Sequence, residues 1–99
     1  MGLDIEWVSP DRTILDAVTD GPRDLLTQAI LAAAGRSPLL DIDPYTTTEV
    51  SPSPQLTAAI RRLRDEQTDL DTSLHLGRLL GIAAAAEGVR GSFLRFIGD

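Results

Sequence analysis

The side chains best suited to acid–base chemistry in this chain are Asp71, His75 and Arg78. His75 is the only histidine; it follows Asp71 by four residues and precedes Arg78 by three, so a helix would place all three on one strip. A histidine oriented by a carboxylate is the core of a general base. The chain has no cysteine, and no serine in a G-x-S-x-G turn that would serve as the nucleophile. We therefore favour a solvated helix face and assign no catalytic residue.

Two D-x-D pairs are the residues that would attract a hard cation: Asp41 with Asp43, and Asp69 with Asp71. Such a cation needs several oxygen ligands at once. Neither pair continues into the glycine and terminal glutamate of a calcium loop. Turn formation before Pro44 accounts for the first pair, and helix capping accounts for the second. We predict no metal site and no other cofactor.

Charged and polar residues elsewhere are the candidates for binding. The only basic cluster, Arg61, Arg62 and Arg64, is followed at once by acidic residues, and the net charge of the chain is −6. This balance argues against nucleic acid, whereas arginine is enriched in protein interfaces. The polar, proline-rich segment 37–53 is the other surface expected to make contacts. The predicted binding residues are Asp41, Asp43, Tyr45, Glu49, Arg61, Arg62 and Arg64.

The element that must position these residues is the apolar stretch Leu70 to Gly88. Its polar side chains occupy one narrow strip, which predicts a helix in the middle of the domain with the other helices packed around it. Gly77, Gly81 and Ala85 recur every fourth residue along one edge of this helix. Tight packing within the monomer is the favoured explanation, and a homodimer seam is the alternative.

Both ends of the chain have the pattern of strands. Leu3 to Val8 alternates apolar and acidic residues, and Ser92 to Ile97 is short, apolar and aromatic. We predict that these two strands pair and form a small sheet.

Three further helices are predicted from their start signals. Ser9-Pro10-Asp11 predicts a helix with Ile14, Leu15 and Val18 on its apolar stripe, ended by Asp20-Gly21-Pro22. A second helix is capped by Asp20 or Gly21 and has Pro22 at its first position. Its predicted apolar face is Leu25, Leu26, Ala29, Ile30 and Ala33. Ser53-Pro54 begins a third, amphipathic helix that carries Leu56, Ala59, Ile60 and Leu63. For segment 37–53 we favour an extended loop over a hairpin of residues 39–42 and 46–50.

Length and composition set the class of protein. Ninety-nine residues with 42% hydrophobic content indicate one globular domain, residues 1–99. The expected fold is α+β, with three or four helices around the central helix (about 70–88) and a sheet formed mainly by the terminal strands. The longest apolar run is far shorter than the ~20 residues that span a bilayer, and no targeting pattern is visible, so we expect no membrane partner and a cytoplasmic location. All nine basic residues are Arg and Asn is absent, which suggests a GC-rich bacterial gene.

These observations favour a small acidic bacterial protein-binding domain. One hypothesis is an inhibitor of the immunity or antitoxin type that acts by covering its partner's surface. The alternative is a small enzyme or ligand-binding domain that uses a carboxylate, His and Arg cluster. A protein partner is expected, a homodimer is a further hypothesis, and nucleic acid is not expected.

Overall fold

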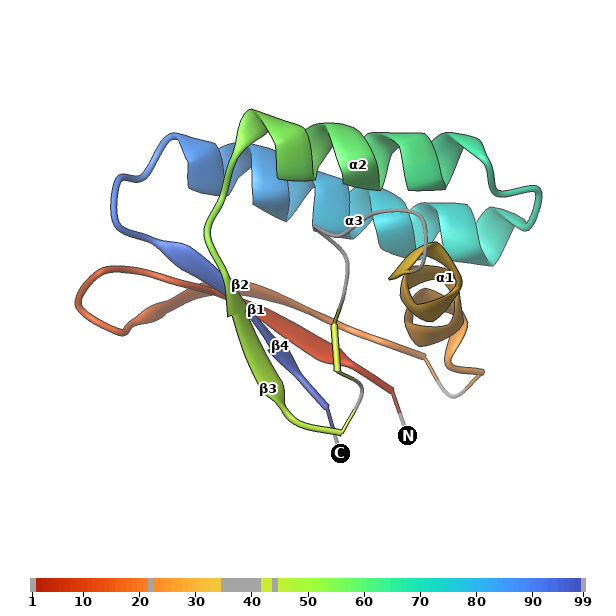
Figure 1. Cartoon of the computed structure of the whole chain (residues 1–99), viewed down its shortest axis with the longest axis horizontal. Coiled ribbons are helices and arrows are strands. Elements are labelled where there is room, and N and C mark those ends of the chain that lie inside the picture. Colours follow the sequence, from red (N-terminus) through yellow and green to blue (C-terminus); the bar gives the residue numbers. More distant parts are fainter. Residues whose placement is uncertain (1, 22, 35–41, 44, 99) are drawn as a thin grey trace.

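The fold is α+β: one antiparallel sheet whose inner face is covered by helices (Figure 1). The computed structural model describes residues 2–21, 23–34, 42–43 and 45–98. Among these residues the elements are β1 (Asp4–Val8), β2 (Ile14–Thr19), α1 (Leu25–Ala34), β3 (Thr47–Val50), α2 (Pro54–Asp65), α3 (Leu70–Glu87) and β4 (Phe93–Ile97). None of these helices is long and apolar enough to cross a bilayer.

The strand order is β2-β1-β4-β3, and each neighbouring pair is antiparallel. The two terminal strands lie in the centre, with Asp4 opposite Ile97 and Val8 opposite Phe93. The predicted pairing of the chain ends is therefore confirmed. The prediction that these two strands make up most of the sheet was incomplete, because β2 and β3 extend it on both sides.

The helix predicted to start at Ser9 is wrong, because this region forms a β-hairpin. The Ser9 amide donates to the Thr13 carbonyl at 2.8 Å, Asp11 accepts from the Ser9 hydroxyl, and Arg12 adopts a φ of 71°. β2 then pairs with β1. Ser and Asp bond to nearby amides in turns as readily as at helix starts. The β-branched residues of β2 favour the strand once β1 offers a partner.

Part of segment 37–53 is also a strand. β3 pairs with β4, with Thr47 opposite Ile97, so the extended-loop prediction is wrong for these four residues. Among the described strands the partner of β3 is β4. Residues 39–41 of the alternative hairpin lie outside the described part of the chain. Ile42 is buried in the core.

The predicted starts of the two longest helices are confirmed by their caps. The Ser53 hydroxyl accepts from the Leu56 amide at 3.0 Å, with Pro54 in the first turn of α2. The Asp69 carboxylate accepts from the Thr72 amide at 3.0 Å and caps α3. The apolar face predicted for the second helix is confirmed at Leu26, Ala29, Ile30 and Ala33, which are buried, but α1 begins at Leu25, later than predicted.

Helix α3 contacts both other helices and strands β1, β2 and β4. Its inner face buries Thr72, Leu76, Leu79, Ile82, Ala83 and Ala86. Its outer face is open, because Leu70 is 71% exposed and Leu74 55%. Helix α3 therefore contacts most elements of the fold through its inner face and leaves Leu70 and Leu74 of its outer face exposed.

Tight packing against a neighbouring element does not explain why α3 has a glycine at position 81. A Cβ atom added at Gly81 would meet no other atom within 4 Å. At Gly77 the added atom would lie 3.3 Å from the guanidinium carbon of Arg64 on α2, so only that glycine makes room for a neighbour. The predicted packing role is wrong for Gly81.

The Asp20 carboxylate joins three elements at one end of the sheet. It accepts hydrogen bonds from the Leu26 amide at 3.0 Å, the Thr27 amide at 2.7 Å and the Thr27 hydroxyl at 2.6 Å. That hydroxyl oxygen accepts in turn from the Leu3 amide at 2.7 Å. The end of β2, the first turn of α1 and the chain before β1 are thereby linked. Burial raises the pKa of Asp20, but the hydrogen bonds from Thr27 and the neighbouring amides lower it by more, so the net pKa lies below its ordinary value.

Replacing Asp20 with Ala is expected to lower the free energy of unfolding by about 2 kcal/mol at neutral pH, because buried amides of α1 lose their acceptor. A carboxyl whose pKa is lowered by folding contributes its full stability above the unfolded pKa, ~3.9 for Asp. That contribution is lost as the pH falls through the folded-state pKa, so the difference between wild type and variant should shrink below about pH 4. Urea unfolding across pH measures both effects. The exposed Asp4 on β1 supplies the control Asp4→Ala, and an equal loss in both variants would contradict the role given to Asp20.

Replacing Gly81 with Ala is expected to stabilise the monomer by up to ~1 kcal/mol, because Ala has the higher helix propensity and its methyl group meets open space. Chemical unfolding at low protein concentration is the measurement. Ala84→Gly, at another exposed position of α3, should cause a loss of similar size. A destabilised Gly81→Ala variant would show that a neighbouring atom occupies the space beside Gly81.

Candidate functional site

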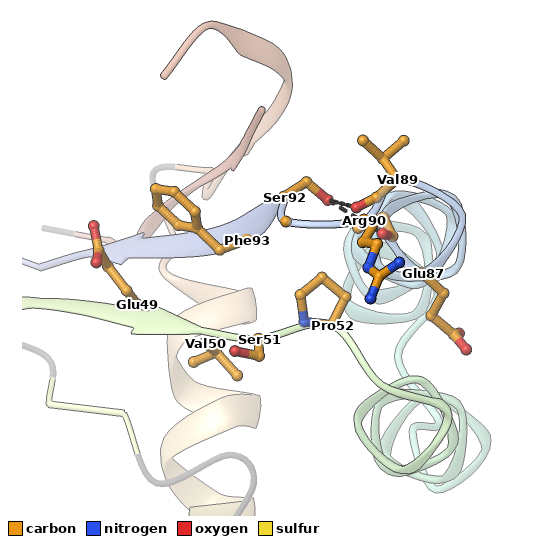
Figure 2. Close-up of a pocket in the computed structure, with 11 residues that line it drawn as sticks. Glu49, Val50, Ser51, Pro52, Glu87, Val89, Arg90, Ser92 and Phe93 are labelled. Carbon is orange, nitrogen blue, oxygen red and sulfur yellow. Dashed lines mark hydrogen bonds between the residues drawn. The ribbon is translucent and has the colours of Figure 1, made fainter. Parts of the chain in front are cut away.

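A cavity of about 600 Å³ lies where β3 ends and the chain turns from α3 into β4 (Figure 2). Two chain segments that are far apart in sequence form it. It is lined by Glu49, Val50, Ser51 and Pro52 from the first segment and by Ala86, Glu87, Val89, Arg90, Gly91, Ser92 and Phe93 from the second. Its volume is within the usual range for ligand pockets, ~300–1,000 Å³.

The loop 88–92 that forms one wall of the cavity is held by hydrogen bonds. The buried Ser92 hydroxyl lies 2.7 Å from the Val89 carbonyl, which Figure 2 marks, and 3.2 Å from the Ala86 carbonyl. Gly91 has a φ of +84°, a conformation that favours glycine, and an added Cβ would lie 3.1 Å from Pro10. The guanidinium carbon of Arg12 lies 6.0 Å from the centre of the Phe93 ring. The β1–β2 hairpin turn thus supports this wall from outside.

Three charged side chains border the cavity: Glu49, Glu87 and Arg90. Glu87 is fixed by the Thr57 hydroxyl of α2, which donates to its carboxylate at 2.5 Å. Arg90 is exposed and forms no ion pair within the described part of the chain. The Ser92 hydroxyl is committed to backbone carbonyls, and no histidine lines the cavity. This set suits hydrogen bonding and ion pairing with a bound group rather than proton transfer to a nucleophile.

Of the predicted binding residues, only Glu49 lines this cavity. Asp43 accepts a hydrogen bond from the Tyr45 amide at 2.9 Å, and Tyr45 is 73% exposed. Both residues precede β3 and so lie beyond the opposite end of that strand. Asp41 falls outside the described residues.

The predicted binding arginines lie on a helix and not on the sheet. Arg61, Arg62 and Arg64 are exposed on α2, whereas Glu49 belongs to β3 and Asp43 to the chain before it. The Arg64 guanidinium lies against Gly77 of α3. The structure therefore does not gather the predicted residues into one site.

The sequence prediction missed Arg90 and Ser92. The signal that pointed to them was the pair Gly88 and Gly91, which marks the exit from α3. It indicated a loop, but it did not indicate that the loop faces the end of β3.

The acid–base strip on α3 does not form a catalytic dyad. The His75 Nδ1 atom lies 2.8 Å from the backbone carbonyl of Asp71, while the Asp71 carboxylate lies 3.7 Å from Arg23. This agrees with the interpretation of the strip as a helix surface. Within the described residues no group of three or more His, Cys, Asp or Glu side chains is placed to hold a metal ion. No protein-family model, curated protein or solved structure matches the chain.

Replacing Ser92 with Ala is expected to lower the free energy of unfolding by ~1 kcal/mol and to speed amide exchange in residues 88–92. The reason is that the hydrogen bonds from the Ser92 hydroxyl to the Val89 and Ala86 carbonyls are lost. The matched control is Ser51→Ala, an exposed serine in the same cavity lining. Hydrogen exchange and urea unfolding report the two effects. Unchanged exchange in Ser92→Ala would mean that the loop is held by other contacts.

Proposed function

We propose that this chain is a protein-binding domain that acts by occupying its partner's surface, with the cavity beside β3 as an anchor point. The observation that carries the proposal is the position of this cavity at the end of an edge strand. Within the described sheet β3 pairs only with β4, and the proposal is that its other edge binds an extended segment of the partner. A side chain of that segment would enter the cavity.

The expected partner segment is basic. Two carboxylates, those of Glu49 and Glu87, border the cavity against the single guanidinium of Arg90. The whole chain carries a net charge of −6, and complementary fields speed encounter with a positive surface. An inhibitor of the immunity or antitoxin type would use this surface to cover a basic site of its partner.

A small anionic ligand bound at Arg90 is the second candidate function. The volume of the cavity and the guanidinium without an ion pair in the described residues favour it. The enzyme or ligand-binding alternative, which names Asp41, Asp43, His75 or Arg78, stays a proposal. Asp41 lies outside the described residues, and the His75 Nδ1 atom lies 2.8 Å from the Asp71 backbone carbonyl.

Photo-crosslinking tests the protein-binding proposal. A crosslinking amino acid replaces Glu49 beside the cavity, Arg62 on α2, or the exposed Ala32 on α1 as the control. In a lysate of the source organism we expect a discrete crosslinked protein from position 49. Capture should weaken at about 0.5 M salt, where the Debye length falls to a few ångströms.

Each other outcome has a definite meaning. Capture from position 62 alone would move the interface to the arginines of α2. Equal labelling from all three positions, or none from any, would contradict the protein-binding proposal. A rise in melting temperature with small carboxylates or inorganic phosphate, lost in Arg90→Ala, would favour the ligand alternative.

A further inference from the structure

The outer face of α3 carries an apolar stripe: Leu70, Leu74, Gly81 and Ala85. These residues follow one another at spacings of four, seven and four, which keeps them on one side of a helix. All four are exposed, Leu70 by 71% and Leu74 by 55%. A solvent-facing helix surface normally carries charged residues, so an apolar stripe of this length indicates a contact surface.

The stripe is large at one end and small at the other. Both leucines belong to the first half of α3, and Gly81 and Ala85 to the second. Beside the small half lies a hollow of about 350 Å³. Its walls are Gly77, Arg78, Gly81, Ile82 and Ala85 of α3 and Trp7, Asp16 and Ala17 of the sheet. The open space around Gly81 belongs to this hollow.

We propose that two copies of this chain associate through antiparallel α3 helices, so that the leucines of each copy lie against Gly81 and Ala85 of the other. A twofold axis makes the contact isologous, which means that both copies use the same stripe and that the two stripes run in opposite directions. Leu70 and Leu74 of each copy then face Ala85 and Gly81 of the other copy. A parallel arrangement would set leucine against leucine and leave both hollows empty.

Neighbouring residues extend the apolar contact and give it a polar rim. β2 borders the hollow through Asp16 and Ala17. A stable interface needs roughly 1,000 Å² of buried surface. Asp16 and Arg78, of opposite charge, both line the hollow. Small residues at Gly81 and Ala85 let the two helix axes approach to about 8 Å, the lower end of the usual range.

Sedimentation equilibrium of the whole chain tests this dimer. We expect a monomer–dimer equilibrium in the wild type and at least about tenfold weaker association in Leu74→Asp, which would bury a carboxylate. Gly81→Leu should also be monomeric, because its side chain fills the hollow. The control Leu31→Asp, at an exposed leucine of α1, should associate like the wild type. Circular dichroism of each variant checks folding.

The orientation is tested by exchanging large and small residues. The double variant Leu74→Ala with Gly81→Leu restores large-to-small contacts only between antiparallel helices, so it should dimerise where Gly81→Leu does not. Trp7, the only tryptophan, lines the hollow, and its emission should shift with concentration in every variant that dimerises.

A wild type that stays monomeric at high concentration, or a Leu74→Asp variant that still dimerises, would overturn the proposal. Failure of the double variant to dimerise while it remains folded would overturn the antiparallel orientation. None of these results depends on the cavity beside β3.

Discussion

The register between β1 and β4 determines which side chains can form a core. Ile5 lies opposite Phe96, and both are fully buried beneath the helices. One residue along each strand, Glu6 lies opposite Arg95, and their side chains form an ion pair of 2.6 Å on the other face. A slip by one residue would move this pair inside and the two apolar side chains outside. Because the two strands come from opposite ends of the chain, every other element folds within a loop that this pairing closes.

Much of the fold was predictable because it depends on local patterns. The alternation of Leu3 to Val8, the caps Ser53 and Asp69, and the apolar face of α1 each specify their own structure. The hairpin at Ser9 was not predictable in this way. Its serine and aspartate satisfy nearby amides in a turn or in a helix, and the choice between the two depends on the pairing of β2 with β1. The four residues of β3 depend in the same way on β4.

The candidate surfaces depend even more on distant contacts. The cavity joins residues 49–52 to residues 86–93, and nothing local to either segment indicates the other. Only Glu49 was predicted, because its segment was polar and rich in proline. For α3 the sequence showed the row of small residues, but not which side of the helix the other elements cover. The structure identifies the covered side of α3, because it buries Leu76 and Leu79 and exposes Leu74 and Gly81.

The closeness of Pro10 to Gly91 places the β1–β2 hairpin next to both surfaces, since a Cβ added at Gly91 would lie 3.1 Å from the Pro10 ring. Gly91 belongs to the wall of the cavity, and Pro10 belongs to the turn that leads into β2. β2 in turn borders the hollow beside α3. The same hairpin reaches the cavity wall through Arg12, whose guanidinium carbon lies 6.0 Å from the centre of the Phe93 ring. The β1–β2 hairpin therefore lies beside both surfaces, one at its turn and the other along β2.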